Sequence, residues 1–116
     1  MEIIKTTINT NDKKALYKLT KSASERVQDL ERGTSFPVDA FALYKESKVS
    51  KSGEVKEQTV LSVISGAVKF STISGTFIES FLEIVELMDG EPFAIIITGG
   101  TSKGGREYVD CELDCN

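Results

Sequence analysis

Apolar and polar positions alternate along most of the chain after residue 35, and the alternation is interrupted once by a helical spacing. Residues 36–46, 54–65 and 67–72 alternate with a period near two, which predicts three β-strands. A polar, lysine-containing turn at 47–53 separates the first two. Residues 93–98 are apolar on both faces and 106–113 alternate again, so we expect these two strands to close the chain as a hairpin.

The segment between the third and fourth of these strands has the period of an amphipathic α-helix. Its apolar residues recur at i, i+3, i+4, i+7 and i+10, namely Ile78, Phe81, Leu82, Val85 and Met88. Thr76 followed three residues later by Glu79 predicts a capping box at the helix start. Gly90 and then Pro92 predict its end.

The first third of the chain has weaker patterns. Residues 4–8 predict a short strand, and residues 11–20 predict a short helix with Thr10 or Asn11 as N-cap. Residues 22–32 are polar, with only Val27 and Leu30 to bury, and their pattern fits a helix as well as an ordered loop.

The element order from residue 35 is therefore β-β-β-α-β-β, which is the order of an OB-fold, a five-stranded barrel. We expect a mainly β protein with helices, in which the apolar helix face closes the bottom of the barrel. Another small α+β sheet would share this order. The length predicts a single domain, 1–116, with residues 1–34 as an N-terminal extension and 35–113 as the barrel core.

The predicted closing hairpin carries four glycines near its tip: Gly99, Gly100, Gly104 and Gly105. Glycine adopts positive φ at no steric cost, so we expect a tight, exposed, mobile turn that presents Lys103 and Arg106. The spacing from Gly99 to Gly104 imitates the start of a phosphate-binding loop. That loop needs a following lysine and hydroxyl and a helix, whereas here Gly105, Arg106 and a strand follow, so we reject it.

Composition excludes several chemistries. The chain has no histidine, so a Ser/His/Asp or Cys/His catalytic set is ruled out and no enzyme activity is expected. Its two cysteines, Cys111 and Cys115, match no four-ligand zinc pattern, and neither a disulfide framework nor any cofactor is expected. The polar start and short apolar runs predict a soluble, cytoplasmic protein without a membrane span.

Charge is unevenly distributed around a net value of −4. Residues 13–26 hold five cations and one acid, whereas residues 79–91 hold five acids and no cation. A basic segment and a basic hairpin tip combined with strand aromatics are typical of single-stranded nucleic-acid binding, in which cations track phosphates and rings stack on bases. The competing interpretation is ordinary solvated charge on helix and strand surfaces.

The candidate contacts divide into cations and rings. Lys14, Lys18 and Lys21 would form a phosphate clamp on the N-terminal helix, or a solvated helix face; the sequence favours neither. On the strands, the candidate cations are Lys45, Lys56, Lys69, Lys103 and Arg106. The candidate stacking rings are Tyr44, Phe70 and Tyr108, with the tyrosines expected to be better exposed and Phe70 equally compatible with the core.

Four segments together resemble a known family. They are residues 11–21, 42–44, 74–78 and 99–108, of which the stretch Gly100-Thr101-Ser102-Lys103-Gly104-Gly105-Arg106-Glu107-Tyr108 is the most specific. The chain resembles small single-stranded DNA-binding proteins from phages of Gram-positive bacteria, lactococcal phages among them. The resemblance implies an OB-fold, binding of single-stranded DNA without sequence specificity, no cofactor, and a role in phage DNA replication or recombination.

Other functions remain open at this point. A small domain offers a short binding site, so we expect a homo-oligomer, and phage recombination or replication proteins are further expected partners. The alternative is a protein-interaction module that binds a host or recombination factor through the acidic helix at 79–91 and its edge strands. A small enzyme or an oligosaccharide binder on the same fold is the third hypothesis.

Overall fold

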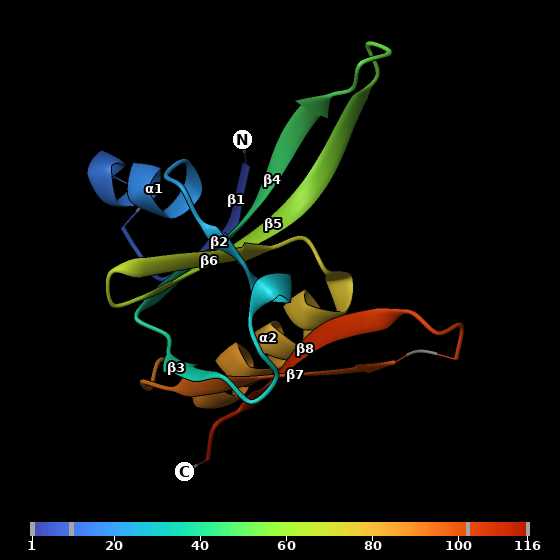
Figure 1. The fold of residues 1–116 in the computed structure, drawn as a ribbon. Helices are drawn as coiled ribbons and strands as arrows, with labels where there is room; N and C mark the ends of the chain where they lie inside the picture. The colour runs from blue at the N-terminus through green and yellow to red at the C-terminus, as the bar shows by residue number, and fades with distance from the viewer. Residues whose placement is uncertain (1, 10, 102, 116) are drawn as a thin grey trace.

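Two β-sheets form the body of the molecule (Figure 1), and the computed structural model describes residues 2–9, 11–101 and 103–115. The five-stranded sheet has the order β1 (Glu2–Thr6), β4 (Ala40–Val49), β5 (Val55–Ser65), β6 (Val68–Thr72) and β2 (Glu25–Arg26). The three-stranded sheet has the order β3 (Ser35–Pro37), β7 (Ala94–Thr101) and β8 (Glu107–Leu113). All pairings are antiparallel except β2 with β6.

Two α-helices accompany the sheets, so the predicted mainly β composition with helices is confirmed. Helix α1 (Lys13–Thr20) is capped by Asp12, whose side chain accepts from the Ala15 amide, rather than by Asn11. The other predicted cap, Thr10, lies outside the described residues. The N-cap of helix α2 (Gly75–Met88) is Ser74, two residues before the predicted cap Thr76, because the Ser74 side chain accepts from the amide of Phe77.

The long strand predicted at 36–46 is divided between the two sheets. β3 pairs with β7, but at residues 38 and 39 the backbone changes partner: the Val38 amide donates to Phe93 O, at 3.0 Å, and the Asp39 amide to Ile64 O, at 2.9 Å. Asp39 also accepts from the Gly66 amide at 2.6 Å. Pro37, which lacks an N–H, ends the first pairing and the chain continues as β4 in the larger sheet.

From residue 35 the observed order is β-β-β-β-α-β-β rather than β-β-β-α-β-β, because the first predicted strand is divided into β3 and β4, and the predicted five-stranded barrel is not confirmed. In the described part of the chain the larger and smaller sheets are hydrogen-bonded as separate ladders and do not close. The N-terminal residues also enter the larger sheet, since β1 lies beside β4 and β2 lies beside β6. Residues 22–32, which the pattern left undecided, form β2 followed by the single 3₁₀ turn η1 (Val27–Asp29).

The main core lies between the two sheets and α2. Fully buried Phe77 and Phe81 of α2 pack with Leu61 of β5 and with Ile95 and Ile97 of β7. A second, smaller cluster fills the opposite face of the larger sheet, where Leu19 of α1 packs against the sheet; its buried members are Leu19, Ala42, Tyr44 and Val60. Strands β4 and β5 are therefore covered on both faces in their central part, which explains why four consecutive residues, 41–44, are buried.

Two hairpins project beyond this core on the side of η1 (Figure 1). β1 pairs only with residues 42–45 of β4, and β6 pairs only with residues 61–65 of β5. The outer part of the β4–β5 hairpin, residues 46–60, consequently has no neighbouring strand among the described residues and forms an arm. The β7–β8 hairpin forms the second projection.

Candidate nucleic-acid interface

Two hollows that share one lining residue lie beside the arm and beside the β7–β8 hairpin. The first, ≈ 260 Å³, lies beside the arm and includes Arg26, Gln28, Lys48 and Gln58. The second, ≈ 350 Å³, lies between the η1 loop and the β7–β8 hairpin. Gln28 lines both hollows, so they form one surface, which we call the inter-hairpin surface. Its charged and amide residues are Arg26, Gln28, Glu31, Arg32, Lys48, Gln58 and Glu107.

The arm places two lysines directly opposite each other. In the β4–β5 register Lys48 pairs with Lys56, and the next pair on the same face is Glu46 with Gln58. Both lysines are exposed, and they line a hollow at the end of the arm with Lys51. Like charges at directly opposed strand positions repel each other and destabilise the hairpin. A polyanion on this face would remove that repulsion.

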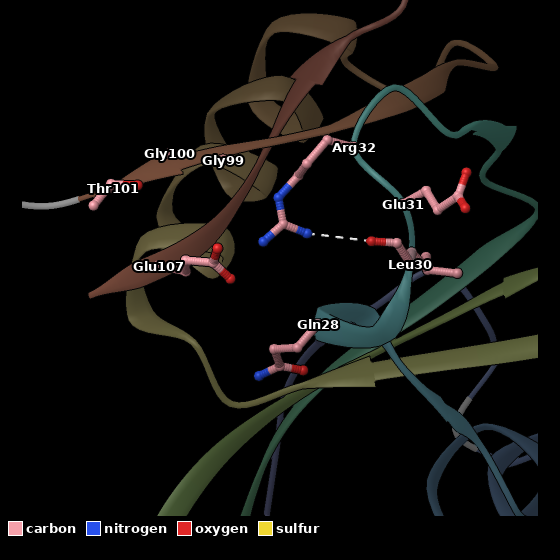
Figure 2. Close-up of a pocket in the computed structure, with 8 residues that line it drawn as sticks. All are labelled: Gln28, Leu30, Glu31, Arg32, Gly99, Gly100, Thr101 and Glu107. Carbon is pink, nitrogen blue, oxygen red and sulfur yellow. Dashed lines mark hydrogen bonds between the residues drawn. The ribbon is translucent and has the colours of Figure 1, made fainter. Parts of the chain in front are cut away.

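Arg32 is held in a fixed position at the second hollow (Figure 2). Its guanidinium donates to Leu30 O at 3.2 Å and to Tyr108 O at 3.3 Å. The side chain crosses β7 at Gly99, where a Cβ would lie 2.5 Å from Arg32 Nε. Glycine at position 99 is therefore the residue that leaves room for the arginine, and the arginine joins the η1 loop to the β7–β8 hairpin.

This geometry corrects the predicted role of two tip glycines. Gly99 and Gly100 belong to strand β7, where they pair with Val109 and Tyr108, and are not part of the turn. A Cβ at Gly100 would lie 2.9 Å from the Tyr108 hydroxyl. These glycines provide space for side chains that cross the strand, whereas Gly105, with φ of +81°, has the predicted turn conformation. Ser102, part of the motif that carried the resemblance, lies outside the described residues.

Tyr108 is exposed, as predicted, but it lies on the far face of its hairpin. Glu107 and Val109 share one face of β8, on which Glu107 lines the second hollow and Val109 enters the core. Alternation along the strand places Tyr108 on the opposite face. The ring is 42% exposed, so it is accessible to a base only from outside the inter-hairpin surface.

Tyr44 and Phe70 are core residues, which corrects the stacking role expected of them. Tyr44 is 3% exposed, and its hydroxyl donates to Thr20 O at 3.2 Å. Burial raises the pKa of this phenol. Phe70 stacks on Phe36 with ring centroids 4.7 Å apart inside the main core. Neither ring presents a free face, because the sheet is covered on both sides where they lie.

Lys69 is also buried rather than presented to a ligand. Its Nζ donates to Ser22 O at 2.6 Å, and the residue is 8% exposed. Burial lowers the pKa of this ammonium group. The side chain ties β6 to the loop that follows α1, so its role in the structure is to hold that loop.

The other predicted cations are exposed but spread over three places. Lys14, Lys18 and Lys21 lie on α1, where Lys21 forms an ion pair with Glu46 of the arm at 3.6 Å. Lys45 is exposed on β4, and Lys103 and Arg106 are exposed at the end of the β7–β8 hairpin. The structure thus brings α1 and the arm together through Lys21 and leaves the hairpin-tip cations on the other side of the inter-hairpin surface.

None of the charged and amide residues of this surface was among the predicted contacts; they are Arg26, Gln28, Glu31, Arg32, Lys48, Gln58 and Glu107. Gln28 and Arg32 lie in the segment whose pattern was undecided, and the fold around Gly99 is needed to see what Arg32 contacts. Lys48 and Lys56 did carry a usable signal. They are symmetric about the turn at 50–53, and that symmetry indicates cross-strand pairing.

The remaining chemistry of the described residues is limited. They contain no group of three or more acidic, cysteine or histidine side chains placed to hold a metal ion. Cys111 is a buried thiol whose pKa burial raises to about 12, and Cys115 is exposed and free. No helix in the described ranges is both long and apolar enough to cross a membrane.

Comparison with known families gives a match that covers nearly the whole chain. Residues 1–114 match the family described as Phage Single-stranded DNA-binding protein, of the phi29 type. The chain belongs to this family. The phage single-stranded DNA-binding class that the resemblance implied is thereby confirmed, while the lactococcal type is not supported. No curated protein and no solved structure gives a significant match.

Membership in the family gives the coarse function. Its members are phage proteins that bind single-stranded DNA, and DNA binding without catalysis is consistent with a chain that has no histidine. The inter-hairpin surface is the place in this structure where cations, hollows and projecting hairpins coincide.

Proposed function

We propose that the protein binds single-stranded DNA without sequence specificity, along the inter-hairpin surface, during phage DNA replication or recombination. The observation that carries this proposal is the directly opposed pair Lys48 and Lys56 on an arm that has no neighbouring strand among the described residues. Such a pair destabilises the free hairpin and is compensated when phosphates lie against it. The element order supports an open relative of the OB-fold, in which oligonucleotides lie between hairpin loops.

In this arrangement the strand would pass from the arm across η1 to the second hairpin. Lys48, Lys51 and Lys56 would neutralise phosphates at one end, and Lys103 and Arg106 at the other. The cations Lys14, Lys18, Lys21 and Lys45 would extend the phosphate path beside the arm, because Lys21 already contacts the arm at Glu46. Attraction of this kind depends on charge and not on base identity, which supports binding without sequence specificity.

The residues lining the two hollows include no aromatic side chain, so bases would be held by other groups. Arginine guanidinium planes stack on bases, and both Arg26 and Arg32 line the surface. Ile73, which is 57% exposed, adds an apolar contact at the first hollow. Tyr108 would contact a base only where the strand passes around the outer face of its hairpin.

The setting of this activity follows from the family. A phage protein of this kind would act in the cytoplasm of the infected bacterial cell, and replication or recombination proteins would be its partners. Homo-oligomerisation would extend a short site along the strand, since a single small domain covers few nucleotides.

Competition binding tests the proposal directly. Labelled oligo-dT is titrated with the protein at several salt concentrations, and unlabelled oligo-dT or duplex of equal length is added as competitor. We expect oligo-dT to compete well, duplex to compete poorly, and affinity to fall steeply with salt because several phosphates are neutralised. Failure to bind oligo-dT at low salt would remove the proposal.

A second function, docking of a host or recombination factor on α2, has one observation in its favour. Leu87 is 74% exposed on a helix whose outer residues Glu79, Glu83 and Glu86 are acidic and exposed. A basic partner with an apolar contact would fit this face. Binding of such a partner would survive Lys48→Gln with Lys56→Gln, whereas DNA binding would weaken.

A further inference from the structure

The hollow between the η1 loop and the β7–β8 hairpin has a different character from the basic arm. Figure 2 shows Glu107 of β8, Gln28 of η1 and Arg32 of the loop after η1 around it, while the Glu31 side chain turns away. Arg32 already donates two hydrogen bonds to backbone carbonyls, at 3.2 and 3.3 Å. Besides the remaining N–H donors of Arg32, the hollow offers a ligand two side-chain acceptors, the Glu107 carboxylate and the Gln28 carbonyl.

The side chain of Gln28 has an acceptor atom that no described residue satisfies. Its Oε1 atom is buried and has no hydrogen-bond partner within the part of the chain that the structure describes. A buried acceptor without a donor is unfavourable, and such atoms are uncommon in folded proteins. Since Gln28 lines both hollows, rotation of its amide would bring this acceptor to either one.

The charged residues that line the hollow are Glu31, Glu107 and Arg32, so two carboxylates accompany one guanidinium and a phosphate is disfavoured there. A nucleobase does fit: it is neutral, it has N–H donors on its edge, and its face can lie against the guanidinium of Arg32. The volume, ≈ 350 Å³, is at the lower end of the range for small-molecule pockets, about 300–1,000 Å³. The lysines of the arm and of the hairpin tip flank the hollow and suit the phosphates on either side.

We propose, building on the proposed single-strand binding, that this hollow receives one base of the bound strand and favours a base with several edge donors. Guanine fits best, since its N1–H and 2-amino groups are adjacent donors that the Glu107 carboxylate can accept as a bidentate pair, with the Gln28 acceptor lining the same hollow. Thymine offers only N3–H. The protein therefore reads one position of an otherwise non-specific site.

A substitution scan tests this assignment. The oligo-dT used has the length that binds one protein copy, so that its register is fixed, and each thymine in turn is replaced by guanine or by inosine, which lacks the 2-amino group. We expect one position at which guanine raises affinity about 3- to 30-fold over thymine, the range of one or two hydrogen bonds to a charged or neutral acceptor. Inosine at that position should give a smaller gain.

Variants connect the preference to the hollow. Glu107→Gln and Gln28→Met should each bring the guanine-to-thymine affinity ratio at that position close to one. Glu112→Gln is the matched control, because Glu112 is exposed on the opposite face of the same strand and should leave the ratio unchanged. Binding with equal affinity for every substituted oligonucleotide would overturn the base pocket while leaving single-strand binding intact. Absence of binding to all of them would overturn the proposed function itself.

Discussion

Replacement of the opposed lysines of the arm should change stability and DNA binding in opposite directions. The double variant Lys48→Gln with Lys56→Gln removes two like charges that face each other across the β4–β5 ladder. In the free protein this substitution removes a repulsion, whereas in the complex it removes two phosphate contacts. Few other roles for a lysine pair predict a gain in one property together with a loss in the other.

The expected change in stability can be estimated from the β4–β5 pairing, in which the two lysines are directly opposed. A directly opposed like-charge pair is unfavourable by roughly 0.2–1 kcal/mol relative to neutral residues. A protein of 116 residues shifts its Tm by about 4 °C for each kcal/mol, so the variant should melt about 1–4 °C higher than the native protein at low salt. Added salt should reduce this difference, because exposed charges are screened.

The binding effect is larger. Each phosphate neutralised on a single strand contributes about 0.7 to the slope of log affinity against log salt, so the loss of two contacts should reduce that slope by about 1.4. At 0.1 M salt this corresponds to about 25-fold weaker binding of oligo-dT. The difference should shrink toward zero as salt approaches 1 M.

Thermal denaturation and fluorescence anisotropy with oligo-dT measure the two effects. Lys5→Gln with Lys13→Gln is the control, since it changes net charge equally and both lysines are exposed outside the inter-hairpin surface. It should leave the salt slope near the native value and should not raise the Tm. A double arm variant that melts lower than the native protein, or binds oligo-dT with an unchanged slope, would refute this account of the arm.

Three further substitutions test other parts of the structure. Gly99→Ala should destabilise the protein by about 1–3 kcal/mol in urea denaturation, because the new methyl group meets the backbone of Tyr108 and the Arg32 side chain; native stability would contradict the crossing of β7 by that arginine. In the native protein a thiol reagent should label Cys115 rapidly and Cys111 only after denaturation. Because burial raises the pKa of Cys111 from 9.0 to about 12, the folded state keeps a proton that the unfolded state loses, so stability should fall between pH 9 and 12 by about 1 kcal/mol per pH unit; an equal slope in Cys111→Ala would exclude this cause. Lys69→Met should leave the salt slope for oligo-dT unchanged, since the ammonium group is already bonded to a carbonyl inside the protein; a reduced slope would show that it reaches DNA.

Local sequence patterns are sufficient to predict the helices and strands, and insufficient to predict which strands pair with one another. The helical spacing of Ile78, Phe81 and Val85 correctly predicts α2, because an amphipathic face is recorded in the sequence itself. The division of residues 36–46 at Asp39 depends on which backbone carbonyls are within reach, and those belong to distant strands. A sequence pattern contains no information of that kind.

The same limit explains the errors at the candidate site. Tyr44 alternates as an exposed residue would, but α1 covers the face on which it lies. Gly99 and Gly100 were interpreted by their conformational freedom, whereas their function in this fold is the absence of a Cβ beside Arg32 and Tyr108. The sequence indicated the class of ligand through its cations, and the fold showed which cations lie together.

Mapping of backbone amide chemical shifts on addition of oligo-dT tests the location of the binding surface most directly. The account predicts that the largest shift changes fall in residues 26–32, 48–58, 99–101 and 103–108, with little change in α2. Changes concentrated in α2, or confined to β1 and α1 with none in the arm or the β7–β8 hairpin, would contradict binding at the inter-hairpin surface.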